Sequence, residues 1–235
     1  MGKSIEAPWV AGLRAAKANV IPALVMQASM VALLAAYYLF PPTTRWLNNL
    51  AALKGEWGYG FSALAAVIAG ALIPEMMRVC AFQKGKLSHT NFLNLIATIP
   101  FWGFNGIVVD LLYRSFANWF GTEVSFQVVA TKVLLDQLVF GPLYASPTSA
   151  WFYDWKNNNY SFMNTRRFFT KIYYREVIVP TIFAGWAVWV PVVTIIYSLP
   201  SLLQIPLFAL ALAMWVILYT WISEARAGMK FPTSS

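Results

Sequence analysis

The chain has 235 residues, of which 59% are hydrophobic and only 11% are charged, and its formal net charge is +8. Soluble domains carry about 25% charged residues, so this composition places the chain among integral membrane proteins. The single cysteine, Cys80, excludes an internal disulfide and the paired-cysteine metal sites. The basic residues cluster between apolar stretches, which favours a topology signal over nucleic-acid binding.

The first 20 residues predict a short basic amphipathic helix that lies on the membrane surface, with Trp9, Val10 and Leu13 on its apolar side. Six apolar stretches follow, and a helix needs about 20 such residues to cross a bilayer. They indicate one all-α membrane domain, a bundle of six helices over residues 21–223, with a polar tail over residues 224–235. The expected spans are residues 21–40, 57–82, 92–116, 126–151, 177–199 and 205–223.

The connecting segments indicate how the chain is oriented in the membrane. Residues 41–56 read as a short polar loop. Residues 154–176 mix basic and aromatic side chains, which favours an interfacial segment that faces anionic lipid head groups over a single-stranded nucleic-acid site. Lysine and arginine concentrate in the N-terminus, the second loop, the fourth loop and the tail. The positive-inside rule therefore predicts that both termini lie on the same side.

Three of the expected spans carry a carboxylate with a cation three or four residues away. Residues at these spacings share a helix face and can pair. A charge at bilayer depth costs at least about 2.5–3.5 kcal/mol, so a charged side chain there faces the bundle interior or a water-filled cavity. For Glu75 and Arg78 the favoured position is the end of their span, where a long arginine reaches the interface, and the membrane interior is the alternative. Two roles stay open for the charged residues of the three spans and for Gln137, namely structural ion pairs and the lining of an aqueous pathway. The pairs are Glu75 with Arg78, Asp110 with Arg114, and Lys132 with Asp136.

The sequence lacks the residue sets of membrane enzymes. It has no Gly-x-Ser-x-Gly, no His-Glu-x-x-His and no phosphate-binding glycine loop. One histidine, His89, and one cysteine are too few for a zinc site or a haem pair. We therefore expect no catalytic residues, no metal and no cofactor, and an enzyme that acts on lipids is the least favoured reading.

Several motifs occur in one order along residues 100–223. Lys132-Val-Leu-Leu-Asp136-Gln137 followed by Gly141-Pro142 is similar to a Lys-x-x-x-Asp-Gln-x-x-x-x-Pro segment. Together with the later motifs, it resembles the family of the Mpv-seventeen proteins and the twenty-two-kilodalton peroxisomal membrane proteins. The later residues that carry the resemblance are Pro180, Trp186, Trp189, Pro191, Pro200 and Trp215.

The chain departs from the family pattern in its last hairpin, where Thr194, Gln204 and Val216 replace polar positions of the family. The resemblance implies a small helical membrane protein of the peroxisome or the mitochondrial inner membrane, whereas a bacterial inner membrane fits the physics equally well. It also implies a channel for small solutes or ions, which is our leading expectation. The alternative is a non-conducting structural protein whose ion pairs fix helix packing. A homo-oligomer stays open.

Overall fold

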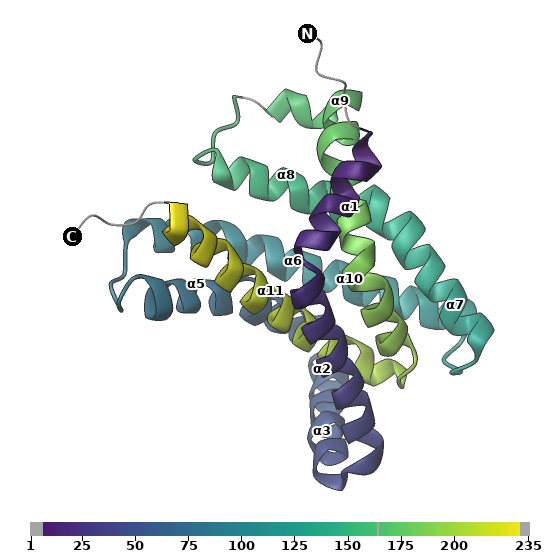
Figure 1. Cartoon of the computed structure of the whole chain (residues 1–235). Coiled ribbons are helices and arrows are strands. Elements are labelled where there is room, and N and C mark those ends of the chain that lie inside the picture. Colours follow the sequence, from purple (N-terminus) through teal and green to yellow (C-terminus); the bar gives the residue numbers. More distant parts are fainter. Residues whose placement is uncertain (1–6, 164, 231–235) are drawn as a thin grey trace.

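The computed structural model describes residues 7–163 and 165–230, and every regular element in these ranges is helical. Six segments are long and apolar enough to span a membrane, which confirms the expected all-α membrane fold (Figure 1). Residues 1–6 of the expected amphipathic helix and residues 231–235 of the polar tail lie outside the described residues. The common side of the two termini stays a prediction. The six segments are Val20–Leu39, Tyr59–Phe82, His89–Phe120, Phe126–Asn157, Lys171–Tyr197 and Ser201–Leu218.

Three spans contain π-helical turns: Pro142 lies inside one, and two others end two residues before Pro74 and Pro180, whereas the turn Arg78–Phe82 has no adjoining proline. Proline has no N–H and crowds the preceding turn, so a local change of hydrogen-bond register accommodates it. Helix α11 continues to Lys230, beyond the span end expected at residue 223. The elements in chain order, with η for π or 3₁₀ turns, are α1 (Pro8–Ala18), α2 (Val20–Leu39), α3 (Pro41–Trp57), α4 (Tyr59–Val67), η1 (Ile68–Leu72), α5 (Ile73–Met77), η2 (Arg78–Phe82), α6 (His89–Phe120), α7 (Phe126–Leu135), η3 (Asp136–Ala145), α8 (Ser146–Asn157), η4 (Thr165–Phe169), α9 (Lys171–Tyr173), η5 (Tyr174–Ile178), α10 (Val179–Tyr197) and α11 (Ser201–Lys230).

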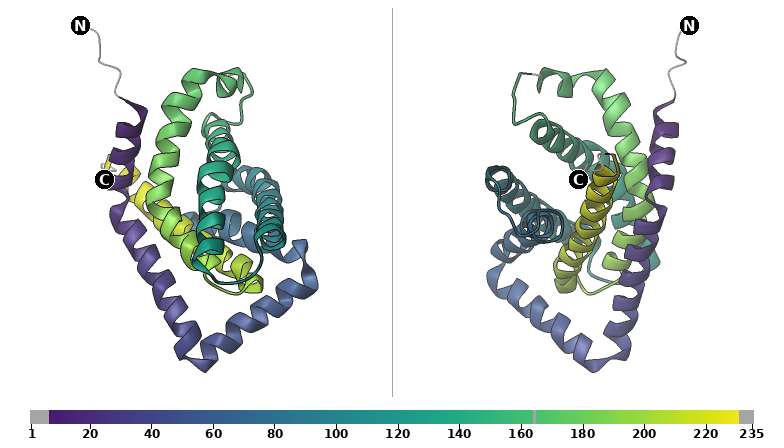
Figure 2. Two further views of the ribbon diagram at one scale, coloured as in Figure 1. Left: turned by 90° about the vertical axis from the view of Figure 1, so that its right-hand side faces the viewer. Right: turned by 60° about the vertical axis from the view of Figure 1, so that its left-hand side comes forward.

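The segment after the first span is a helix, not the polar loop that the sequence predicted. Two prolines open α3, and proline fits the first helical turn because the N–H groups there have no partner within the helix. Leu47, Ala51 and Lys54 are buried, and their spacing of four and three residues places them on one face. Helices α2 and α3 form a V, which Figure 2 shows at the lower edge of the molecule. Helix α3 thus leads the chain back to the bundle and buries one of its faces there.

Helices α1 and α2 follow one another with only Asn19 between them, and α1 packs along α10 (Figure 2). Gly12 makes this close approach possible. A Cβ atom at Gly12 would lie 2.6 Å from Cβ of Phe183 and 2.9 Å from the carbonyl oxygen of Pro180. The N-terminal helix is therefore fixed against the fifth span as well as joined to the first.

The long helix α6 contacts several neighbouring helices through polar side chains. The side chain of Ser88 caps its first turn together with Asn91, and Gly121, at a φ of 86°, ends it. Midway, Gly106 lets α4 approach, since a Cβ there would lie 2.3 Å from the carbonyl oxygen of Ser62. Backbone contact of this kind is typical of helix packing in membranes. The hydrophobic effect does not drive association there, and small residues allow the close van der Waals packing that does.

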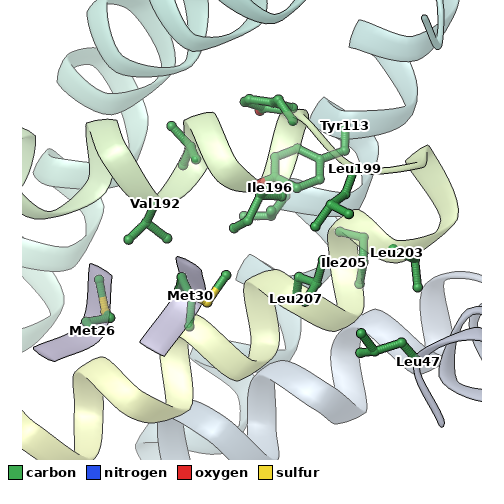
Figure 3. Close-up of a cluster of buried hydrophobic side chains, with 14 of the residues drawn as sticks. Met26, Met30, Leu47, Tyr113, Val192, Ile196, Leu199, Leu203, Ile205 and Leu207 are labelled. Atoms are coloured by element: carbon green, nitrogen blue, oxygen red, sulfur yellow. The ribbon is translucent and has the colours of Figure 1, made fainter. Parts of the chain in front are cut away.

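The apolar core lies where the hairpin of α10 and α11 meets α2, α3 and α6. Val192 and Ile196 of α10 are fully buried and face Met26 and Met30 of α2 (Figure 3). Leu207 of α11 adds to the same cluster. The core thus fixes the hairpin, and with it Tyr197 at the end of α10, against the first span and α6.

Candidate functional site: three buried carboxylates

Among the carboxylates that the structure describes, Asp110 of α6 is the most enclosed, with 1% of its surface exposed. Lys54 of α3 donates to it at 2.7 Å, and Arg114 of α6 donates at 3.0 Å. The hydroxyl of Ser62 in α4 donates at 2.7 Å, and the guanidinium of Arg114 lies 4.7 Å from the ring centre of Tyr59. The expected pair with Arg114 is present, but Lys54 was missed. Two cations and a hydroxyl therefore stabilise this charge and join three helices.

Glu75 of α5 forms a second cluster, where the second span meets the start of α6. Arg78 donates to it at 2.7 Å, which is the pair that the sequence predicted. The amide of Asn91 donates to its other oxygen at 2.8 Å, while the same residue caps α6 with Ser88. Glu75 is 5% exposed. This carboxylate therefore ties the end of one span to the first turn of the next.

Asp136, at the start of η3, differs from the other two carboxylates. It is 7% exposed, and its hydrogen-bond donors are neutral. The hydroxyl of Tyr197 donates at 2.6 Å, and the amide of Gln137 donates at 3.1 Å. No Lys, Arg or His in the described part of the chain forms an ion pair with it.

The predicted pair between Lys132 and Asp136 is wrong. The ammonium of Lys132, which is 2% exposed, instead donates at 2.7 Å to the carbonyl oxygen of Gly121 at the end of α6. The last carbonyls of a helix have no partner within it and carry the negative end of its dipole, so a cation is favourable there. The i,i+4 spacing allows the pair with Asp136, but the ammonium of Lys132 binds the C-terminal end of α6 instead.

The segment after Asp136 has an altered backbone register. Pro142 lies inside η3 and has no N–H. In a π-helix the N–H of a residue pairs with the carbonyl five residues earlier, which for Pro142 is the carbonyl of Gln137. The indole N–H of Trp186 in α10 donates to this carbonyl oxygen at 2.9 Å. Trp186, one of the residues that carry the resemblance, thus supplies the hydrogen bond that Pro142 cannot donate.

The other residues of the resemblance have packing roles in the last hairpin. Pro180 lies in the first turn of α10, and Pro191 lies inside that helix. Trp189 lies beside Phe208, with ring centres 6.0 Å apart and the ring planes tilted by 33°. Pro200 lies in the turn between α10 and α11, where its carbonyl accepts from the N–H of Leu203, and Trp215 packs against the core of the bundle. None of these five residues contacts Asp136 through a hydrogen bond.

A polar stripe on α6 was missed by the sequence analysis. Asn91, Asn94, Thr98 and Asn105 recur at spacings of three, four and seven residues, which place them on one helix face. The hydroxyl of Tyr160 donates to Asn94 at 2.7 Å, and a second tyrosine, Tyr144, donates to Asn105 at 3.1 Å. This periodicity was the signal that could have found the stripe.

Among the described residues, no group of three or more His, Cys, Asp or Glu side chains converges as metal ligands would. Comparisons of the chain with models of protein families, with curated proteins and with solved structures find no match. The fold defines the class of the protein: it is a multi-pass, all-helical membrane protein.

Proposed function

We propose that this protein provides a pathway for small solutes or ions across its membrane, and that Asp136 lies on that pathway. The observation that carries the proposal is the environment of Asp136, a buried carboxylate whose hydrogen-bond partners are the neutral groups of Tyr197 and Gln137. Its two counterparts, Glu75 and Asp110, each have a cation in contact.

The energetics favour a functional role for Asp136. A charge at bilayer depth costs at least about 2.5–3.5 kcal/mol, and cations in contact offset this cost at Glu75 and Asp110. At Asp136 only neutral donors do so, which leaves its charge available to a cation that enters the bundle. Asp136 and Gln137 are both buried, so on this proposal the described conformation corresponds to a closed one, and conduction requires a movement that exposes them.

The resemblance of residues 100–223 to the Mpv-seventeen and twenty-two-kilodalton peroxisomal membrane proteins supports the same proposal, since channel activity is what that family implies. It also favours an organelle membrane, with a bacterial inner membrane as the alternative. The segment of η4, α9 and η5 carries exposed basic and aromatic side chains, among them Arg166 and Phe169, which suit contact with anionic lipid head groups.

One observation favours a second candidate, a non-conducting structural protein. Asp110 is paired with Lys54 and Arg114 and bonded to Ser62, as expected of a charge cluster that only fixes helix packing. On this second reading Asp136 is a further packing element, held by Tyr197.

The test is a planar-bilayer recording of the purified protein beside the variant Asp136→Asn. Asparagine keeps an oxygen that accepts from Tyr197, so the fold is retained while the charge is removed. Glu123→Gln removes a carboxylate in the exposed loop between α6 and α7 and is the matched control. We expect discrete openings whose size or cation selectivity changes in Asp136→Asn and not in the control. A silent bilayer from folded, monodisperse protein would favour the structural candidate.

A further inference from the structure

A hollow of about 480 Å³ lies along one face of α1 and the first turns of α2, and Ala187 of α10 contributes to its wall. Its volume is within the range of about 300–1,000 Å³ that is usual for small-molecule sites. Apolar side chains form most of its lining, among them Leu13, Val20 and Leu24. Arg14 and Lys17 are the charged residues of the described lining.

The walls of this groove are held in place without a ligand. At one end, Gly12 brings α1 into backbone contact with α10 at Pro180. At the other end, the side-chain amide of Gln27 in α2 donates to the carbonyl oxygen of Ala187 in α10 at 2.9 Å. These two contacts lie fifteen residues apart on the α1–α2 segment, and most of the residues that line the groove lie between them.

The charge of the groove is concentrated at one level. Arg14 and Lys17 are exposed, three residues apart, and line the groove just before the apolar span begins at Val20. The twenty residues of α2 that follow contain no Asp, Glu, Lys or Arg, and the described lining contains no acidic side chain. A ligand that fits this pattern has an anionic head and an apolar chain that continues along a membrane-spanning helix.

We propose that the groove binds one molecule of an anionic phospholipid. Its phosphate lies at Arg14 and Lys17, and one acyl chain lies along Val20 and Leu24. Basic side chains at the level of the head groups attract anionic lipids, and apolar side chains below them accept the chain. This site is separate from Asp136, so its existence does not depend on the permeation pathway.

The experiment is native mass spectrometry of the purified protein in neutral detergent, titrated with dioleoyl phosphatidylglycerol, dioleoyl phosphatidylcholine or inorganic phosphate. We expect one tightly held phosphatidylglycerol, weaker retention of phosphatidylcholine and no retention of phosphate alone. Arg14→Gln with Lys17→Gln weakens retention about 30-fold, because each basic side chain near a lipid surface contributes about one kilocalorie per mole. Ala16→Leu, which narrows the groove without changing its charge, weakens it as well.

The matched control is Lys84→Gln with Lys86→Gln, which removes the same charge from the exposed loop before α6. It retains the lipid as the unmodified protein does. Equal loss in the control means that attraction to net charge, not the groove, holds the lipid, and that overturns the proposal. Equal retention of phosphatidylcholine, or unchanged binding in the groove variants, overturns it too. Melting temperatures in detergent show that each variant is folded, and Lys17→Gln alone replaces the double variant if that one does not fold.

Discussion

The buried ion pair between Lys54 and Asp110 gives a sharp test of how this bundle is held together. Lys54→Met removes the ammonium that lies 2.7 Å from Asp110 but keeps a side chain of similar length on the buried face of α3. The carboxylate then keeps the hydroxyl of Ser62 and the guanidinium of Arg114. We expect a loss of stability and a loosened contact between α3 and α6.

The magnitude follows from burial. Removing one partner of a buried pair costs about 3–5 kcal/mol, because the other charge stays buried without compensation. Arg114 still compensates Asp110, so we expect the lower end, about 3 kcal/mol. Lys54→Met combined with Asp110→Leu removes both buried charges, and the side chain of Arg114, which is 47% exposed, can be hydrated. Apolar replacement of a buried pair is often neutral or stabilising, so the double variant should lie within about 1 kcal/mol of the unmodified protein.

The measurement is equilibrium unfolding by dodecyl sulfate in mixed micelles, followed by circular dichroism. Arg45→Met, on the exposed face of the same helix, is the control and should be close to neutral. A free energy of unfolding for Lys54→Met within about 1 kcal/mol of the unmodified protein would refute the reasoning, because the buried charge of Asp110 would then not depend on Lys54. A double variant as unstable as the single one would also refute it.

Two further predictions concern contacts that bring helices together, each read out in the same unfolding assay. Trp186→Phe should cost about 1–2 kcal/mol, since it removes the N–H that donates to the carbonyl of Gln137, and a loss below a few tenths would mean that another donor replaces it. Gly106→Ala should cost about 1–3 kcal/mol because its Cβ would lie 2.3 Å from the backbone oxygen of Ser62. Gly60→Ala on the adjoining helix, with nothing within 4 Å, should be neutral or stabilising by up to about 1 kcal/mol, and equal effects of the two glycine changes would contradict the packing.

The local part of the candidate site could be predicted from the sequence. Apolar length predicted the helices, and helical spacing predicted two ion pairs, Glu75 with Arg78 and Asp110 with Arg114. These inferences succeed because a helix fixes the positions of residues three and four apart whatever surrounds it. The same rule failed for Lys132, where a helix end eleven residues earlier in the chain competes for the cation.

Partners that are distant in the chain could not be predicted. Lys54 was assigned to a loop, and its carboxylate lies 56 residues further on in another helix. A signal was nevertheless present, because Leu47, Ala51 and Lys54 follow one helical face, on which a lysine is unusual unless it is paired. The bond between Asp136 and Tyr197 spans 61 residues and depends on how α10 packs, which no local pattern encodes.

The arrangement around Asp136 indicates where the bundle would open if it conducts. Displacement of helix α6 would break the ion pair between Lys54 of α3 and Asp110, and the hydrogen bond from Asn91 to the carboxylate of Glu75 in the second span. The contact between η3 and α10 contains hydrogen bonds and no ion pair among the described residues: Trp186 donates to the carbonyl of Gln137, and Tyr197 donates to Asp136. Helix segment η3 also lacks a regular backbone register at Pro142. A movement of η3 away from α10 would therefore expose Asp136 without breaking an ion pair, and it would leave the charge clusters that hold the other helices intact.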